Sequence, residues 1–208
     1  MARPARFSAD DVLDATLRGV VEHGPGVTVA QVAAQLGGPV GSIYHRFGSR
    51  EELTARLWLR SIGRFQEGML ALGGAADPHE ALVASARHVV RYCSDHPDEA
   101  LALRLHRQDR LLADARLPEP LRAEVAGVNE RLDAVQAELA ARRYGRPDSR
   151  DPADLRRVVL ATRVAPYGLI RPWLGGPLDP ELEDAAAVTA AAILALGDPP
   201  HTGPGRRW

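Results

Sequence analysis

Cysteine, lysine and aromatic side chains are scarce in this 208-residue sequence, and the scarcity excludes some classes of protein. The single cysteine, Cys93, rules out an intrachain disulfide framework and a zinc site built from several thiolates. Lysine is absent, so arginine supplies all 26 basic side chains, and 27 acids bring the formal net charge to -1. The chain therefore lacks the global positive field that strongly basic nucleic-acid-binding proteins carry.

Long apolar runs are also missing. The longest run, at about residues 185–196, is shorter than the ~20 residues that a membrane-spanning helix needs, and Thr189 interrupts it. Residues 1–11 contain basic side chains but no apolar segment of the kind found in signal peptides. The sequence predicts a soluble, cytoplasmic protein without a membrane partner.

The composition that remains favours helices over sheet, because Ala and Leu are frequent and aromatic residues make up only 5%. No segment keeps the period-two alternation of a half-buried strand. We therefore expect an all-α fold, in which Pro166 kinks or interrupts one helix. Beyond the first seventy residues, helical patterns fall at about 79–94, 97–112, 120–143, 153–173 and 180–196, and loops at 73–78, 113–120, 145–152 and 175–180.

The first fifty residues carry three helix-start signals of the same kind. Ser8 precedes Asp11 by three residues, Thr28 precedes Gln31, and Ser49 precedes Glu52, so each pair has the spacing of a capping box. These signals predict helices that begin just after Ser8, Thr28 and Ser49.

Two short helices, at about 29–36 and 40–46, are separated only by Gly37, Gly38 and Pro39. Two short helices joined by a tight turn form a helix-turn-helix, whose second helix can enter the major groove of DNA. Residues 39–50 (PVGSIYHRFGSR) supply cations, hydroxyl groups and no acid, which suits contact with phosphates and base edges.

The segment from Thr28 through Gly37, together with GSIYHRFGSREEL at residues 41–53, resembles the DNA-binding domain of the tetracycline-repressor (TetR/AcrR) family. The family pattern has Gly-Thr-Leu-Tyr-x-His-Phe followed by Ser-Lys-Glu-x-Leu. Here Ser42, Ile43, Arg46 and Arg50 replace Thr, Leu, His and Lys. The resemblance covers about residues 8–60. In place of the Val-Ser that commonly precedes the recognition helix, this chain has Gly38-Pro39, so that helix has no hydroxyl cap.

The resemblance implies a one-component transcriptional regulator, usually a repressor, that binds a palindromic operator in double-stranded DNA as a homodimer and is released by an unknown small-molecule effector. It implies a DNA-binding domain at 1–50 and a helical effector-binding and dimerisation domain at 51–197. The composition of the last eleven residues, 198–208, predicts a disordered tail. The resemblance also implies that Val40, Gly41, Ser42, His45 and Arg46 contact bases or nearby sugars, and that Thr28, Tyr44 and Arg50 contact phosphates.

The charge balance gives this interpretation modest support. Residues 1–72 contain eight arginines and seven acids, which is a weak excess for a DNA-binding region. Several of those acids lie on the first helix, so the window at 39–50 stays locally positive.

The second half of the chain offers candidates for an effector pocket and a dimer interface. Bulky, soft or polar side chains among small alanines are consistent with a ligand cavity, although each also fits ordinary core packing. The pocket candidates are Trp58, Phe65, Met69, Tyr92, His106, Arg107, Tyr167 and Trp173. The helix at 180–196 is apolar on more than one face, which favours a two-fold four-helix interface with residues 153–173. Its interface candidates are Ala185, Ala186, Ala192, Ile193 and Leu196.

The sequence gives no positive sign of catalysis, metal binding or a cofactor. Cys93 and His96 have Cys-x-x-His spacing, but two ligands without companions rarely form a zinc site. Nucleophile-elbow, phosphate-loop and zinc-protease motifs are absent. The alternative is a helical small-molecule-binding or enzymatic protein whose helix-turn-helix is vestigial.

Overall fold

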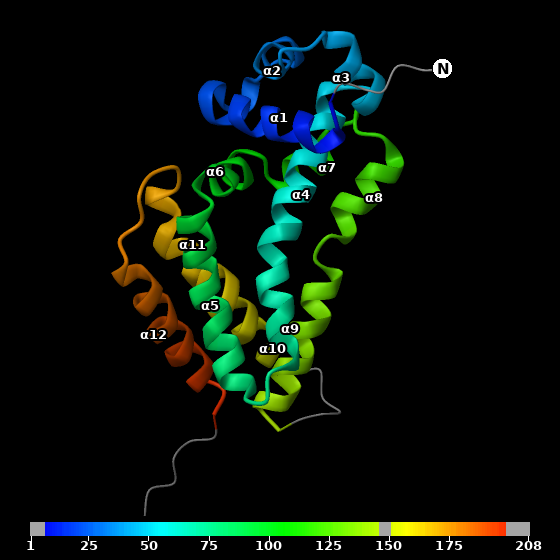
Figure 1. Ribbon diagram of the computed structural model, residues 1–208. Coiled ribbons are helices and arrows are strands. Elements are labelled where there is room, and N and C mark those ends of the chain that lie inside the picture. Colours follow the sequence, from blue (N-terminus) through cyan, green and yellow to red (C-terminus); the bar gives the residue numbers. More distant parts are fainter. Residues whose placement is uncertain (1–6, 146–150, 199–208) are drawn as a thin grey trace, which may run out of the picture. The chain divides into compact units, whose positions relative to one another are not determined.

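The computed structural model describes residues 7–145 and 151–198, and all regular structure within these ranges is helical. This confirms the all-α prediction (Figure 1). The helices are α1 (Ala9–His23), η1 (Gly24–Gly26), α2 (Val29–Leu36), α3 (Val40–Phe47), α4 (Arg50–Leu70), η2 (Ala71–Gly74), α5 (Pro78–Asp95), α6 (Pro97–Leu105), α7 (Gln108–Ala113), α8 (Glu119–Gly127), α9 (Glu130–Arg143), α10 (Pro152–Val159), η3 (Leu160–Val164), α11 (Ala165–Ile170), η4 (Arg171–Trp173) and α12 (Glu181–Ala195).

The chain divides into two compact units. Unit 1 comprises Met1–Glu67, Tyr92–Arg131 and Trp173–Leu178, and unit 2 comprises Gly68–Arg91, Leu132–Pro172 and Asp179–Trp208. Helices α4, α5 and α9 each contribute residues to both units.

The predicted capping boxes fix where the first helices of unit 1 begin. The hydroxyl oxygen of Ser8 accepts a hydrogen bond from the amide of Asp11 at 3.0 Å, and the carboxylate of Asp11 accepts one from the amide of Ser8 at 2.7 Å. Thr28 and Gln31 form the same reciprocal pair at the start of α2. At the start of α4, Ser49 accepts from the amide of Glu52 at 3.0 Å. Each bond satisfies a first-turn amide that the helix itself leaves without an acceptor.

The turn between α2 and α3 depends on two glycines for different reasons. Gly37 ends α2 in the left-handed region, at a φ of 66°, which side chains with a Cβ rarely adopt. Gly38 leaves room for an aromatic ring, because a Cβ there would lie 2.6 Å from Cε2 of Phe7. Pro39 follows and helix α3 begins directly after it, at Val40.

Helices α1 to α3 are held by one apolar core to which later helices also contribute. Ile43 and Phe47 of α3 pack with Leu53 and Leu57 of α4 and with Ala102 of α6. Helix α1 packs against both α2 and α6. The helix-turn-helix is therefore part of unit 1 and does not have a core of its own.

Two of the predicted long helices are wrong in the same way, because each is broken near its middle. The predicted helix at 97–112 separates into α6 and α7, since His106 and Arg107 adopt extended backbone angles. The predicted helix at 120–143 separates into α8 and α9. At that break the amide side chain of Asn129 accepts from Gln66 at 2.9 Å and donates to Gln108 at 3.2 Å. Proline marks neither break, but α8 ends at Gly127, and glycine is a poor helix former.

The predicted irregularity around Pro166 is confirmed as a π-helical turn, η3, between α10 and α11. Proline has no amide hydrogen to donate to the carbonyl four residues earlier, so the α-helical pattern cannot continue unchanged there. Thr162, inside this turn, donates its hydroxyl to the carbonyl of Val158 at 2.8 Å and accepts from the side-chain amide of Gln136 at 2.8 Å.

Unit 2 combines a small-residue core with ion pairs at its surface. Ala161, Ala190 and Leu194 are fully buried and pack with Leu82 and Leu139. Arginines on α5, α9 and η3 pair with acids elsewhere in the unit, as Arg163 does with Asp133 at 2.6 Å. The other such pairs are Arg87–Asp184, Arg91–Glu183 and Arg143–Asp198.

The predicted tail at 198–208 lies outside the described residues except for Asp198. The boundary between a DNA-binding and an effector-binding domain at residues 50 and 51 stays a prediction. The division into compact units does not show which residues bind DNA or an effector.

Candidate nucleic-acid interface and the α4–α7 pocket

Helix α3 has two sharply different faces. Ile43 and Phe47 are buried, with 1% and 6% of their surface exposed, whereas Tyr44 is 47% exposed and Val40 is 37% exposed. Gly41 and His45 are exposed as well. The predicted base-contacting residues Val40, Gly41 and His45 and the predicted phosphate contact Tyr44 are therefore exposed on a short helix whose two core side chains hold it in place.

The first turn of α3 is closed by a side chain other than its N-cap. Pro39 has no side-chain group to cap the helix, and Ser42 donates its hydroxyl to the carbonyl of Pro39 at 2.7 Å. The hydroxyl oxygen of Ser42 can still accept a hydrogen bond, for example from the amino group of a base.

The start of α2 offers amide groups to an anion. The hydroxyl of Thr28 donates to the side-chain oxygen of Gln31 at 2.8 Å, so its proton already has an acceptor. Among the described residues, the amides of Val29 and Ala30 have no acceptor. Amide groups at a helix N-terminus favour phosphate. At this position the backbone is thus a better phosphate donor than the predicted Thr28 side chain.

The two predicted DNA-contacting arginines each lie close to an acid. Arg46 contributes, after the hydrogen bonds from Ser8, to holding the pKa of Asp11 below its usual value. A guanidinium nitrogen of Arg50 lies 3.4 Å from the carboxylate of Glu51, which also pairs with Arg116 at 2.8 Å. The side chain of Arg50 remains 42% exposed. Neither arginine is buried, and each has an acidic neighbour with which a phosphate would compete.

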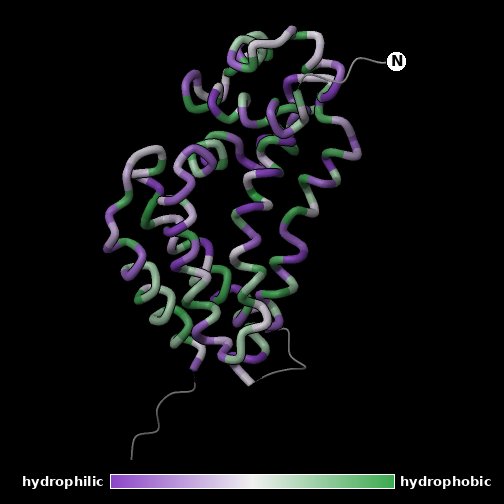
Figure 2. Tube along the Cα trace, viewed as in Figure 1, coloured by the Kyte–Doolittle hydropathy of each residue, from purple (hydrophilic) through white to green (hydrophobic). Residues whose placement is uncertain are grey.

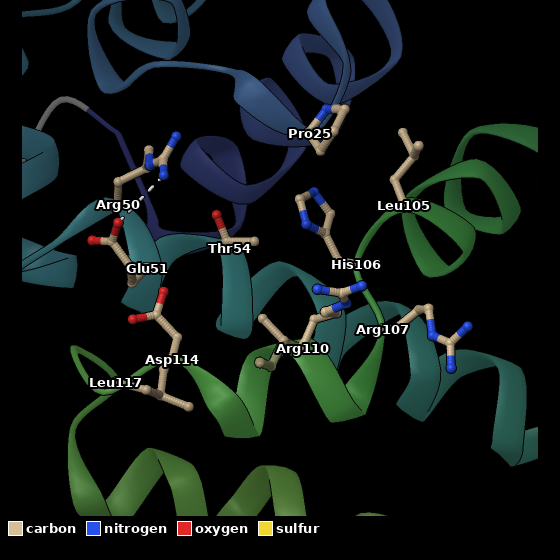
Figure 3. Close-up of a pocket in the computed structure, with 11 residues that line it drawn as sticks. Pro25, Arg50, Glu51, Thr54, Leu105, His106, Arg107, Arg110, Asp114 and Leu117 are labelled. Atoms are coloured by element: carbon tan, nitrogen blue, oxygen red, sulfur yellow. Dashed lines mark hydrogen bonds and ion pairs between the residues drawn. The ribbon is translucent and has the colours of Figure 1, made fainter.

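Arg50 also lines a cavity within unit 1, here called the α4–α7 pocket, with a volume of about 170 Å³ (Figure 3). Its wall is apolar at Pro25 and at three leucines, and polar or charged elsewhere. The lining residues are Pro25, Arg50, Glu51, Thr54, Leu105, His106, Arg107, Arg110, Leu111, Asp114 and Leu117.

His106 is the most enclosed polar group of this pocket. Its residue is 8% exposed, and within the described part of the chain its Nε2 atom is buried without a hydrogen-bond partner. Burial, and secondarily the charge of Arg50, lower the pKa of His106 below its ordinary value. The imidazole is therefore neutral at pH 7 and can donate or accept one hydrogen bond at each nitrogen.

The charged groups around His106 are paired to different degrees. Arg107 binds Asp109 through two hydrogen bonds of 3.0 and 3.1 Å, and this pairing lowers the pKa of Asp109. Asp114 pairs with Arg116 at 2.9 Å, which likewise lowers its pKa. For the side chain of Arg110, no hydrogen bond or ion pair occurs within the described ranges.

The predicted effector residues separate into several locations. His106 and Arg107 line the α4–α7 pocket, and Trp58 packs in an apolar cluster with Leu117 and Leu121. Trp173, also in unit 1, is 54% exposed. Met69 and Tyr167 belong to unit 2, where Met69 is 1% exposed and Tyr167 is 40% exposed.

Phe65 and Tyr92 contact each other edge to face, with their ring centroids 5.4 Å apart. The hydroxyl of Tyr92 donates to the carboxylate of Glu99, a residue that sequence reasoning did not select. Arg64 pairs with the same carboxylate at 2.6 Å. Burial, followed by this hydrogen bond, raises the pKa of Tyr92. Glu99 is 5% exposed and has two partners, so this cluster is a satisfied internal network.

Unit 2 exposes apolar side chains on two neighbouring helical segments. Val188 and Leu196 lie 70% and 73% exposed, and Ala185, Ala192 and Ala195 are exposed on the same helix. Figure 2 shows most of α12 in the green of hydrophobic residues. Leu160, Val164 and Tyr167 form a second exposed row on η3 and α11, which pack against α12.

Of the predicted interface residues, Ala185, Ala192 and Leu196 lie on this exposed surface. Ala186 is fully buried inside the unit, and Ile193 is partly buried against its core. Val188, Leu160 and Val164 are exposed apolar residues that were not among the predicted interface residues.

Other kinds of site find no support in the described ranges. No helix there is both long and apolar enough to cross a membrane. No group of three or more His, Cys, Asp or Glu side chains is arranged to hold a metal ion in that part of the chain.

The chain is similar to known regulatory proteins in sequence at its N-terminus and in fold over most of its length. The sequence model described as "Bacterial regulatory proteins, tetR family" matches residues 12–57. No curated protein sequence matches the chain. Many solved structures share its fold.

Three of these structures carry informative descriptions. A TetR-like transcriptional regulator from Rhodococcus sp. RHA1 is 20% identical, with 94% of this chain and 98% of that chain covered and a TM-score of 0.65. AibR, solved with isovaleryl coenzyme A and operator DNA, is 18% identical, with 89% and 97% covered and a TM-score of 0.64. FadR from Bacillus subtilis, solved with stearoyl-CoA, is 18% identical, with 91% and 97% covered and a TM-score of 0.59. At these identities the similarity shows a shared fold.

Proposed function

Because this chain is a TetR-family transcriptional regulator, we propose that it binds operator DNA as a homodimer through α3 and that a small-molecule effector releases it. The family is one of regulators and not of enzymes, so the catalytic alternative loses its basis. We propose that it acts as a repressor and not as an activator. Bound to its operator it would block transcription, and the effector would end the block by releasing it.

The observation that carries the proposal is the division of α3 into a buried and an exposed face. Ile43 and Phe47 fix the helix to the core, and the exposed side presents Tyr44, His45 and the small Gly41. A recognition helix needs this arrangement, because its outward side chains must reach base edges while its backbone stays close to the groove.

Phosphate contacts would hold this helix in register. The amides of Val29 and Ala30, the hydroxyl of Tyr44 and the guanidinium of Arg50 are suitable donors. These groups carry no sequence information by themselves. Base preference is assigned to His45, Arg46 and Ser42, whose side chains differ in donors and acceptors.

The exposed apolar surface of unit 2 is the proposed dimer interface. Val188 and Ala192 of α12, and Leu196 directly after it, are exposed, and α12 packs against η3 and α11, on which Leu160, Val164 and Tyr167 are exposed. Small alanines allow two copies of α12 to approach closely, and an isologous interface repeats the same surface on both subunits. Two-fold symmetry would then place two recognition helices on half-sites one DNA turn apart, about 34–36 Å.

The effector class is proposed from the related structures. AibR and the Bacillus subtilis FadR were solved with acyl-CoA thioesters, which makes such thioesters the first class to examine for this chain. An effector releases DNA only if it binds the DNA-incompetent state more tightly, so its affinity must fall when operator is present.

The test begins by selecting an operator from a random pool of DNA duplexes with the full-length protein. We expect a palindromic site, bound by two subunits, whose affinity falls steeply with salt. Isovaleryl-CoA and stearoyl-CoA are then titrated with and without the selected duplex. Retention of no particular sequence would contradict the proposed function, and equal affinity of a thioester in both titrations would show that it is no effector.

A further inference from the structure

We propose that the α4–α7 pocket binds a compact organic carboxylate, and that this ligand weakens DNA binding by competing with a DNA phosphate for the guanidinium of Arg50. The competition rests on the proposed function, in which Arg50 holds a phosphate. The binding site rests on the pocket alone.

The size of the pocket limits the ligand. Its volume of about 170 Å³ is close to that of an engineered ~150 Å³ protein cavity that holds benzene, so a compact organic body fits and a whole coenzyme A ester does not. Leu105, Leu111 and Pro25 give this body an apolar wall.

The charges around the pocket favour an anion. Four arginines lie in or beside it, namely Arg50, Arg107, Arg110 and Arg116, together with three acids, Glu51, Asp109 and Asp114. Each of the three acids already pairs with an arginine. The charge of Arg110 acts on Asp109, but its guanidinium makes no hydrogen bond or ion pair among the described residues, and a carboxylate can bind it through two parallel hydrogen bonds.

His106 supplies the second, independent sign that a ligand belongs here. Its imidazole lines the pocket together with Thr54 of α4 and Arg110 of α7 (Figure 3), and the residue is more than nine-tenths buried. The Nε2 atom has no hydrogen-bond partner within the described ranges. A buried polar atom without a partner costs free energy, which a ligand atom that accepts or donates a hydrogen bond would recover.

The position of Arg50 connects this pocket to DNA. Arg50 is the first residue of α4 and lines the pocket, and its charge acts on His106. Its pairing with Glu51 is loose, at 3.4 Å, so the guanidinium can be drawn toward a carboxylate in the pocket. A guanidinium that binds this carboxylate is no longer available to a phosphate.

The binding test uses the full-length protein without DNA. Isobutyrate, isovalerate and benzoate are titrated by calorimetry, beside isobutyramide, isovaleramide and benzamide as uncharged matches. We expect at least one carboxylate to bind about tenfold more tightly than its amide, the size of one charge-assisted hydrogen bond. Arg110→Gln removes this preference. Arg104→Gln, which changes an exposed arginine of α6 outside the pocket, retains it.

The competition test measures how operator affinity depends on salt. Saturating carboxylate should lower the slope by about one per subunit, as Arg50→Ala does, because one phosphate contact is lost in each case. In the Arg50→Ala protein the carboxylate should then cause no further change. His106→Gln, checked for folding by its thermal midpoint, should weaken carboxylate binding without changing the slope in the absence of ligand.

The outcomes separate the two proposals. Failure to select any operator contradicts the proposed function and leaves the calorimetric test of the pocket intact. Equal binding of carboxylates and amides, or binding that Arg110→Gln leaves unchanged, overturns the pocket proposal even if DNA binding is normal. A carboxylate that lowers the salt slope equally in the wild type and in Arg50→Ala overturns the competition.

Discussion

Helices α3 in unit 1 and α12 in unit 2 both expose apolar side chains, but different groups surround those side chains. On α3 the exposed Val40 and Tyr44 alternate with His45 and with other hydrogen-bonding groups. On α12 the exposed Val188 and Leu196 have mainly alanines between them. A surface that mixes apolar contact with donors suits base edges, whereas a smooth alanine-rich surface suits another helix. Exposure alone therefore does not tell which partner a helix has.

The largest expected effect comes from placing a charge on the α12 surface. Val188→Arg should convert the dimer to a monomer, because burying an arginine in the proposed apolar interface removes its hydration and brings the same charge of the second copy close to it. Operator affinity should fall on the order of 100-fold, since each half-site is then bound alone. Light scattering and a binding titration measure both effects. Val188→Ala is the matched control and should remain dimeric, and a dimeric Val188→Arg protein would refute this interface.

A change on α3 should leave the dimer intact and alter DNA recognition alone. Arg46→Ala and His45→Ala should each shift which base is preferred, by about 1–3 kcal/mol at the contacted position. Tyr44→Phe should instead weaken all sequences alike, because it removes a phosphate donor. Binding to a set of single-base operator variants separates these patterns. If both the Arg46→Ala and the His45→Ala protein keep the base preferences of the wild type, α3 is not the helix that reads the base sequence.

Helix α4, which contributes residues to both units, allows a comparison between two glycines. A Cβ at Gly63 would meet no atom within 4 Å, whereas one at Gly68 would lie 2.1 Å from the Cε1 atom of His88. Gly63→Ala should stabilise the protein by about 0.5–1 kcal/mol, because alanine is the better helix former. Gly68→Ala should destabilise it by about 1–3 kcal/mol, because the imidazole must move. Urea unfolding measures both values, and removal of the clash by an added His88→Ala change would confirm the cause.

The smallest effect should come from the proton equilibrium of His106. Burial first, and the charge of Arg50 second, lower its pKa in the folded protein below the ordinary 6.5 of the unfolded chain. The unfolded state therefore binds a proton more readily. The free energy of unfolding keeps this contribution above pH 6.5 and loses it as the pH falls from 6.5 through the folded-state pKa. Urea unfolding between pH 8 and pH 5 should show a decline that is weaker in His106→Gln, and identical declines would contradict it.

Local signals explain why the first part of the chain was predicted in detail. Ser8, Thr28 and Ser49 each form a capping hydrogen bond with a residue only three positions later in the chain. The turn at Gly37 needs glycine because its own backbone is left-handed. Such features act over one helical turn and are visible in any short window of sequence.

Contacts between distant residues explain where the prediction failed or stopped. At the break after Gly127, Asn129 forms hydrogen bonds with Gln66 and Gln108, which lie 63 and 21 residues away. Arg110 joins the candidate site only because the chain turns at His106. The burial of Ala186 and the exposure of Val188 depend on which face of α12 meets unit 2, and an alanine-rich helix gives little periodic signal of that choice.

Because the chain has a single cysteine, a spin label can be attached at a chosen position to measure distances between the two subunits of the proposed dimer. Cys93 is 7% exposed, and burial raises the pKa of its thiol to about 12, so near neutral pH it is neither accessible nor ionised. A cysteine introduced on an exposed position of α1, such as Arg18→Cys, would then be the reactive thiol of each subunit. Spin labels attached there would report the distance between the two DNA-binding regions of the proposed dimer in solution, with and without a ligand. The native cysteine need not be replaced.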